Sequence, residues 1–126
     1  MPSYDSKLFN PPAPLVLVSL RDSATGKIVT DVPMLLDTGA DATLLPESFV
    51  SNLGTSPLQD VFFEIVGANN KSTFTQVVKL EMIFEGRTFR GQFLLIEQDW
   101  GIIGRNILNA LPIIYDGPNL IWNIQI

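Results

Sequence analysis

The sequence of 126 residues contains no histidine and no cysteine. Their absence excludes Ser-His-Asp and Cys-His catalysis, thiolate chemistry, disulfide bonds and the usual ligand sets of zinc, haem and iron–sulfur sites. Acid–base chemistry is therefore left to Asp, Glu, Lys or Tyr side chains, assisted by water. The carboxylates show no EF-hand spacing and the chain has no glycine-rich phosphate loop, so we expect neither a metal ion nor another cofactor.

Positive charge and long apolar runs are also scarce. Eight Lys and Arg residues are scattered among 13 Asp and Glu residues, and the net charge of −5 argues against nucleic-acid binding. The first 14 residues are polar and proline-rich, unlike a signal peptide, and every later apolar run is too short to cross a bilayer. We therefore expect a protein without membrane association and with a cytoplasmic location.

The hydrophobic content of 46% is enough for one domain with a real core. The prolines before residue 15 disfavour a central strand, so residues 1–14 are expected to form a flexible arm and residues 15–126 the domain. Alternation and turn signals predict short strands at 15–20, 28–32, 33–36, 42–45, 61–66, 74–84, 88–96, 113–115 and 120–126. One helical turn is expected near residues 46–50, and one short C-terminal helix at 105–111. The order predicts an all-β fold with a closed barrel.

The most informative segment is Asp37-Thr38-Gly39-Ala40, directly after the apolar run 34–36. It places a carboxylate where a buried strand ends in a turn. Gly39 allows another backbone or a ligand to approach closely. A triplet of this kind also occurs by chance, and an aspartate that only satisfies its own turn is the alternative interpretation.

Two segments and their spacing indicate a family. Residues 34–41, Met-Leu-Leu-Asp-Thr-Gly-Ala-Asp, closely resemble the active-site stretch of retroviral aspartic proteases. Residues 101–108, Gly-Ile-Ile-Gly-Arg-Asn-Ile-Leu, resemble the segment that leads into the single helix of that family. Between them, residues 67–72 form a predicted hairpin tip where the family has its flap. The chain is thus identified as retropepsin-like, and its organisation looks like that of a free-standing cellular or bacterial member or an excised domain.

The resemblance implies an enzyme that needs two copies of the chain. Aspartic proteolysis uses two carboxylates that share one proton: one activates water while the other protonates the substrate carbonyl. Only one Asp-Thr-Gly is present, so a C2 homodimer would supply one Asp37 from each subunit. The implied activity is an aspartic endopeptidase for extended, mainly apolar polypeptide segments. A catalytically silent dimer that binds peptides or serves as an assembly module is the alternative, and an unrelated all-β interaction domain is a third.

The resemblance also assigns roles to residues. Asp37, Thr38 and Gly39 are the implied catalytic residues, with the Thr38 hydroxyl bonded to the partner's backbone. Asp41 is expected to bind substrate backbone and to pair with Arg105, a structural residue of the active site that could instead be a solvated helix-start arginine. The other substrate-binding positions are Leu35, Ala40, Ala42, Val66, Gly67, Ala68, Trp100 and Ile102. A simple core position is the alternative for Leu35 and Ile102, and a rim-packed side chain is the alternative for Trp100.

Two departures from the family pattern concern the flap and the dimer. The predicted flap tip, residues 67–70, reads Gly-Ala-Asn-Asn rather than a nearly all-glycine tip with an isoleucine. The C-terminal part, residues 113–126, is longer than in the viral enzymes and contains its own turn. The resemblance therefore leaves open how the chain ends build the dimer sheet.

Overall fold

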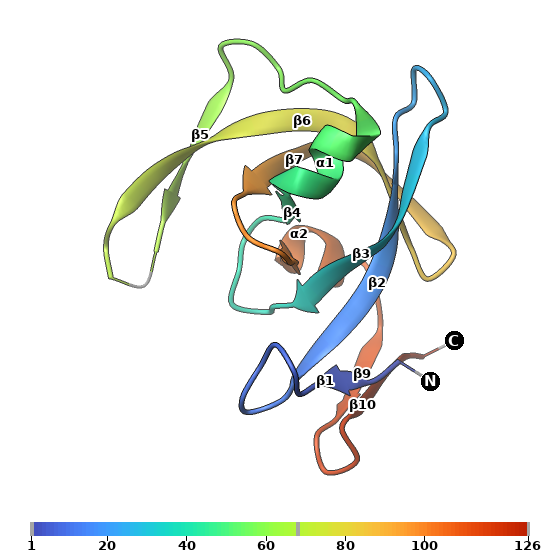
Figure 1. Cartoon of the computed structure of the whole chain (residues 1–126). Coiled ribbons are helices and arrows are strands. Elements are labelled where there is room, and N and C mark those ends of the chain that lie inside the picture. The colour runs from blue at the N-terminus through green and yellow to red at the C-terminus, as the bar shows by residue number, and fades with distance from the viewer. Residues whose placement is uncertain (1, 68, 126) are drawn as a thin grey trace.

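The computed structural model describes residues 2–67 and 69–125, which contain ten strands and two short helices (Figure 1). The strands are β1 Tyr4–Asp5, β2 Ala13–Arg21, β3 Ile28–Leu36, β4 Leu44–Pro46, β5 Phe62–Val66, β6 Ser72–Phe84, β7 Arg87–Ile96, β8 Gly101–Ile103, β9 Ile113–Asp116 and β10 Ile121–Ile124. The helices are α1 Glu47–Leu53 and α2 Arg105–Leu108. The all-β class predicted from the sequence is confirmed. Ala68, predicted to bind substrate, lies outside the described residues.

Eight of the strands form one sheet in the order β1-β2-β3-β8-β4-β7-β6-β5. Strand β2 pairs with β3 on one side and, through its last residues, with β6 on the other. The series of paired strands β2-β3-β8-β4-β7-β6 therefore returns to β2. This connectivity favours the predicted barrel. The pairs β3–β8 and β4–β7 are parallel. The parallel β3–β8 pair brings the end of β3, just before Asp37, beside a segment from the C-terminal part of the chain.

The core cluster includes inward-facing residues of β2, β3, β6 and β7, residues of both helices, and a tryptophan from β10. Trp122 is fully buried, and its ring packs edge to face on Phe84 with 6.0 Å between the ring centroids. Its Nε1 donates a hydrogen bond to the Leu15 carbonyl oxygen at 3.0 Å. The C-terminal strand is therefore part of the hydrophobic core, because an indole without this packing and this acceptor would not be stable there.

Part of the predicted N-terminal arm is held by the rest of the fold. Strand β1 pairs with Ala13 and Pro14, so β2 begins two residues before the predicted strand. The Tyr4 N–H donates to the Leu120 carbonyl oxygen at 2.8 Å, and Ser3 forms a bridge with Ile121. Residues 6–12 make a loop between the two strands. The domain boundary at residue 15 stays a prediction.

Three elements differ from the sequence-based expectation. The helical turn predicted near residues 46–50 is a longer helix, α1, which runs over seven residues and ends at Gly54 with a φ of 82°. Helix α2 is shorter than predicted and continues to Leu111 as single turns. The two strands predicted on either side of residue 33 are one strand, β3, that continues through Pro33. In the described part of the chain neither helix has the length and apolar content needed to span a membrane.

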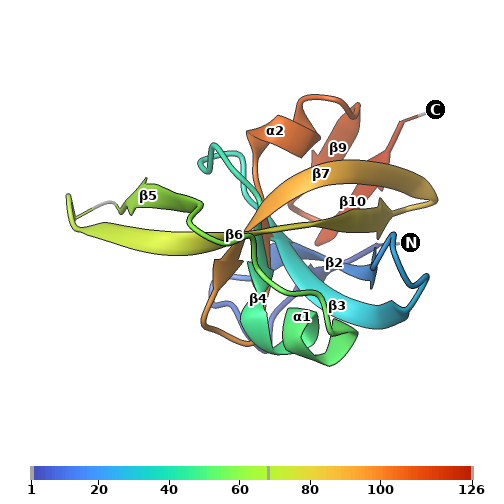
Figure 2. The ribbon, with the colours of Figure 1, turned by 90° about the horizontal axis from the view of Figure 1, so that it is seen from above.

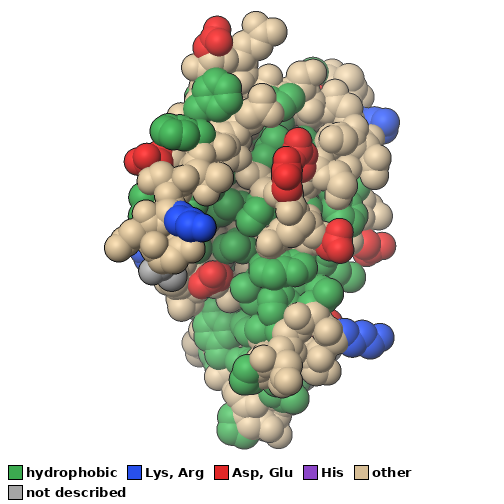
Figure 3. Space-filling view, turned by 60° about the vertical axis from the view of Figure 1, so that its left-hand side comes forward, with side chains coloured by type: hydrophobic (Ala, Val, Ile, Leu, Met, Phe, Trp, Pro, Cys, Tyr) green, Lys and Arg blue, Asp and Glu red, His purple; other side chains and the backbone are tan. Residues whose placement is uncertain are grey.

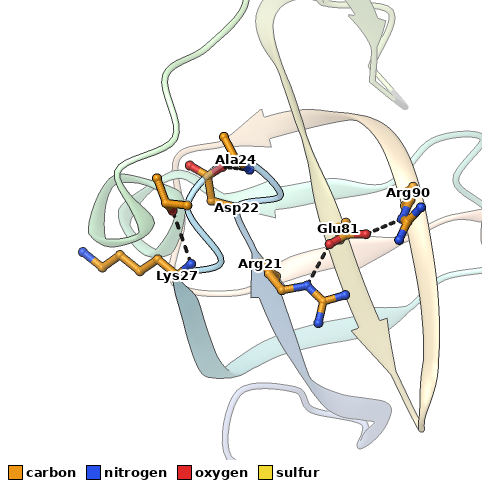
Figure 4. A network of polar contacts seen from close by, with 7 residues as sticks. Arg21, Asp22, Ala24, Lys27, Glu81 and Arg90 are labelled. Carbon is orange, nitrogen blue, oxygen red and sulfur yellow. Dashed lines mark hydrogen bonds and ion pairs between the residues drawn. The ribbon is translucent and has the colours of Figure 1, made fainter.

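A carboxylate that is almost fully buried joins β2, β6 and β7 (Figure 4). The Glu81 side chain accepts a hydrogen bond from Nε of Arg21 at 2.7 Å and another from Nε of Arg90. These hydrogen bonds, that of Arg21 first, hold the pKa of Glu81 below its usual value, while burial acts in the opposite direction. The ionised form of Glu81 is therefore the one that the folded chain stabilises.

We expect Glu81→Gln to lower the urea midpoint of unfolding at neutral pH, and to lower it less as the pH falls. A carboxylate with a depressed folded pKa adds stability that is present above its unfolded pKa of about 4.3 and is lost as the pH falls through the folded pKa. At lower pH the wild type loses the same ion pairs, so the two midpoints should converge. Urea titrations from neutral pH to about pH 3 measure this. Glu64→Gln, at an exposed glutamate of β5, is the control; a Glu81→Gln difference that stays constant with pH would contradict the expectation.

Candidate active site

Three hydrogen bonds hold the turn that follows β3. The Asp37 N–H donates to the Ile103 carbonyl oxygen at 3.0 Å, which ties the turn to β8. The Gly39 N–H donates to Oδ1 of Asp37 at 2.9 Å, and the Ala40 N–H donates to the Asp37 carbonyl oxygen at 3.2 Å. A backbone N–H that donates to a carboxylate fixes its orientation. The same bond also fits the alternative of an aspartate that satisfies its own turn, so the turn by itself does not distinguish the two interpretations.

The carboxylate is placed at the surface of the subunit. Asp37 is half-buried, whereas Thr38 and Gly39 are exposed. A Cβ atom added to Gly39 would lie 3.1 Å from Oδ1 of Asp37, which is closer than most such contacts. A side chain at this position would therefore press on the carboxylate. Glycine leaves both the carboxylate and the turn open to a second group.

Arg105, the first residue of α2, clamps the same turn from its other side. Its Nη1 donates to the Thr38 carbonyl oxygen at 2.6 Å, and its Nη2 forms an ion pair with Oδ1 of Asp41. Its backbone N–H donates to the Ala40 carbonyl oxygen at 2.8 Å. The structure thus brings Asp41 and Arg105 together, as the resemblance implies, and Arg105 is not a merely solvated helix-start residue. Their roles toward a substrate stay predictions.

A second layer of contacts, which the sequence analysis missed, supports this clamp. Thr43 is buried; its Oγ1 accepts a hydrogen bond from the Gly104 N–H at 3.2 Å and donates to Oδ1 of Asn106 at 2.8 Å. A Cβ atom on Gly104 would lie 2.3 Å from the Ala42 carbonyl oxygen and 2.9 Å from that of Ala40. The Gly-Arg-Asn motif could have predicted these contacts, since each of its three residues contacts the segment 38–43.

The predicted pocket residues Leu35 and Ile102 face each other across the parallel β3–β8 pair. Both are half-buried and lie on the outward side of the sheet, while their neighbours Leu36 and Ile103 point into the core. Neither belongs to the buried core cluster. Trp100, just before β8, is also half-buried, and its ring packs against Phe9. Leu35 and Ile102 therefore present apolar surface on the paired strands that lead to the turn with the carboxylate, and Trp100 precedes the start of β8.

The hairpin of β5 and β6 projects away from the rest of the subunit (Figure 2). Val66 and Gly67 lie at its end, and the Gly67 N–H donates to the Lys71 carbonyl oxygen at 3.0 Å. Val66 is 60% exposed. The structure thus places both residues at the tip of a projecting hairpin, the position that the resemblance gives to a flap.

Two cavities are lined by residues of both this hairpin and the body. Hydrophobic side chains gather on the face of the molecule that Figure 3 shows. The first has a volume of about 430 Å³ and is lined by Ile65 and Phe74 of the hairpin and by Leu44 of the body, among others. The second, of about 140 Å³, is lined by residues that include Ala42 and Phe63. Asp37 lines neither of these two cavities.

Metal binding finds no support in the described residues. Residues 2–67 and 69–125 contain no group of three or more Asp and Glu side chains that could hold a metal ion. The polar groups at the turn are the carboxylate of Asp37, the backbone N–H groups of Gly39 and Ala40, and the guanidinium of Arg105.

Comparisons with protein families and with solved structures both relate the chain to retroviral proteases. The family described as "Retroviral aspartyl protease" matches residues 12–113. Among solved structures, "EIAV protease complexed with the inhibitor HBY-793" is similar with a TM-score of 0.59 and 25% sequence identity, over 78% of this chain and 86% of that chain. The search of curated proteins gave no significant match. Since the family match spans most of the chain, including the Asp-Thr-Gly and Gly-Arg-Asn segments, the chain belongs to the retroviral aspartyl protease family.

Proposed function

We propose that the protein is an aspartic endopeptidase that acts as a C2 homodimer. The observation that carries this proposal is the half-buried Asp37 carboxylate, oriented by the Gly39 N–H in a turn that Arg105 holds through the Thr38 carbonyl oxygen, in a chain of the retroviral aspartyl protease family. One subunit offers one such carboxylate. Acid–base catalysis on a peptide bond needs a base for water and an acid for the carbonyl oxygen at the same time, so a second subunit supplies the second Asp37.

In the proposed mechanism the two Asp37 carboxyl groups share one proton. The ionised carboxylate takes a proton from a water molecule, whose oxygen attacks the peptide carbonyl carbon, while the protonated partner donates its proton to the carbonyl oxygen. The C–N bond of the tetrahedral diol then breaks: the protonated carboxyl gives its proton to the leaving nitrogen, and the ionised partner takes a proton from one diol hydroxyl. The dyad is thereby left with one shared proton. The Gly39 N–H holds the carboxylate of its own subunit in place, so the carboxylate does not have to reorient during the reaction.

The substrate in this proposal is an extended, mainly apolar peptide. Leu35 and Ile102 offer apolar surface for side chains beside the scissile bond. The Asp41 side chain is 89% exposed, so it retains acceptor capacity for a backbone N–H of the peptide besides its ion pair with Arg105. The β5–β6 hairpin would cover the bound strand, and main-chain hydrogen bonds would supply affinity.

The dimer contact in this proposal is the edge of β9. Within the described residues β9 pairs with β10 only, and β10 in turn bridges to Ser3 of the same chain. In the part of the chain that the structure describes, the opposite edge of β9 therefore has no partner strand, and an unpaired edge is a template for another strand. Ile114 on this strand is 50% exposed and Tyr115 is 38% exposed. Two β9 strands that meet antiparallel across the C2 axis would cover both residues.

We expect Ile114→Arg to weaken the dimer by about tenfold or more in Kd, since it replaces buried apolar surface by two charges of one sign at a shared interface. Sedimentation equilibrium measures the dissociation constant. Peptidase activity should fall at low protein concentration and recover at high concentration. Ile28→Arg, at a residue of β3 with a similar exposure of 48%, is the matched control. An unchanged dissociation constant for Ile114→Arg would remove β9 from the interface.

The activity itself is tested with the purified full chain and a library of apolar oligopeptides at acidic pH. An endopeptidase should cut within the peptides, and pepstatin should block the cleavage, because it occupies the site of a carboxylate pair. The alternative, a catalytically silent dimer that binds peptides, would show binding without any product. Cleavage that pepstatin leaves untouched would instead point to a contaminating protease.

A further inference from the structure

The loop between β1 and β2, residues 6–12, sets an aromatic ring against Trp100. The rings of Phe9 and Trp100 lie 4.8 Å apart between centroids with an interplanar angle of 66°, an edge-to-face contact. Phe9 is half-buried, whereas its neighbours Leu8 and Asn10 are exposed. The subunit thus partly covers Phe9, the one aromatic residue of this loop.

The loop that carries Phe9 is fastened at its base. Strand β1 pairs with the start of β2, with Tyr4 opposite Pro14 and Asp5 opposite Ala13. The Leu8 N–H donates a hydrogen bond to Oδ2 of Asp5 at 2.6 Å, which closes the first turn of the loop. These contacts limit the positions that the Phe9 ring can take. Phe9 is therefore presented to Trp100 by ordered backbone.

Trp100 is held from a second direction and is joined directly to β8. Nε2 of Gln98 donates to the Trp100 carbonyl oxygen at 2.9 Å. The next residue, Gly101, fits so closely that a Cβ atom there would lie 2.4 Å from the Leu44 carbonyl oxygen. The backbone at Trp100 is thus fixed by Gln98 and Gly101. Among the described residues, Phe9 is the aromatic side chain that contacts the indole ring.

Neither ring contributes to the hydrophobic core. Phe9 and Trp100 are absent from the core cluster and from the residues packed against it, whereas Trp122 lies at its centre. Loss of the Phe9 ring would therefore not open a cavity in the core. If Phe9 served stability alone, its removal would change the free energy of unfolding only slightly. Trp100 stands two residues before Ile102 of β8.

We infer that Phe9 is a positioning residue for the substrate site: it holds the Trp100 indole as one wall of the apolar surface that Leu35 and Ile102 form. This inference rests on the proposed peptidase function. An indole fixed at that place narrows the orientations open to a substrate side chain and gives large apolar side chains a flat surface to pack on. The N-terminal segment thereby contributes to the choice of the residue beside the scissile bond.

The first arm of the test reads the position of the indole without any substrate. Phe9→Ala should increase acrylamide quenching of tryptophan fluorescence and shift the emission to the red, since Trp100 is half-exposed and Trp122 is fully buried. Phe9→Tyr should restore the wild-type spectrum, because it keeps the ring. Leu8→Ala is the matched control in the same loop. Equal quenching in Phe9→Ala and wild type would overturn the inference.

The second arm measures peptide cleavage by the same variants under conditions where all are dimeric. Phe9→Ala should raise KM for a peptide with a large apolar residue at the scissile bond by about 2- to 10-fold, the range expected for loss of an aromatic contact, with kcat nearly unchanged. Its preference for that peptide over an alanine analogue should fall equally, and Phe9→Tyr should restore it. Unchanged preference in an active Phe9→Ala enzyme would overturn this inference alone. A wild type without peptidase activity would overturn the proposed function, and this inference with it.

Discussion

Asp37→Asn is expected to abolish peptide cleavage, with kcat/KM falling by about a thousandfold or more, within the range for loss of a general acid–base group. Asparagine keeps the size of the side chain, and its Oδ1 can still accept the hydrogen bond that the Gly39 N–H gives to Asp37. The turn and its bond to Ile103 should therefore persist. An amide cannot take up or release the proton, so only the chemistry is lost.

Steady-state kinetics on a cleaved apolar peptide measure the loss, and sedimentation shows whether the dimer remains. Asp60→Asn makes the same chemical change at an exposed residue outside the site and should keep full activity. A sharper reading comes from mixed dimers, refolded from wild type and Asp37→Asn together. If each dimer needs both carboxylates, activity falls as the square of the wild-type fraction. A linear decrease would mean that one subunit is sufficient, and the shared-dyad mechanism would be wrong.

The sequence predicts the elements of the candidate site well where the signal is local. Asp37, with its turn glycine, is recognisable because strand end, carboxylate and glycine follow one another in the chain. The pairing of Asp41 with Arg105 was also expected, although the two residues are far apart in sequence, because the Gly-Arg-Asn motif marks the partner. The contact was inferred from the resemblance, since no rule of periodicity joins segments so far apart.

What could not be predicted depends on tertiary contacts. Strand β8 has three residues, too few for an alternation pattern, and exists because it pairs with β3 and β4. Pro33 suggested a break, yet β3 passes through it with Leu17 as its opposite residue on β2. Phe9 lies in a segment that reads as a flexible arm, and its partner Trp100 is set beside it only by the folded sheet. Local sequence does not encode any of these contacts.

The largest expected effect on stability is that of Gly104→Ala. Gly104 has a φ of −93°, which alanine adopts without strain, so the backbone conformation gives no penalty. The added Cβ would, however, lie 2.3 Å from the Ala42 carbonyl oxygen and 2.7 Å from its carbonyl carbon. The segment it strikes is backbone, held by the hydrogen bond from Arg105 to Ala40 and by that from Gly104 to Thr43. Relief of the clash therefore requires the separation of α2 from the turn that follows Asp37, and we expect a loss of about 3 kcal/mol in the free energy of unfolding, the upper end for an overpacked site.

Urea unfolding of the variant and the wild type measures this loss. Gly117→Ala is the matched control: it adds the same methyl group at a turn glycine where a Cβ atom meets nothing within 4 Å. Its stability should equal that of the wild type, while Gly104→Ala unfolds at a clearly lower urea concentration. At low temperature, where Gly104→Ala is still folded, its kcat/KM should also fall, because movement of Ala42 and Ala40 shifts the turn that orients Asp37. A variant that is as stable and as active as Gly117→Ala would show that the close approach of Gly104 does not position the carboxylate.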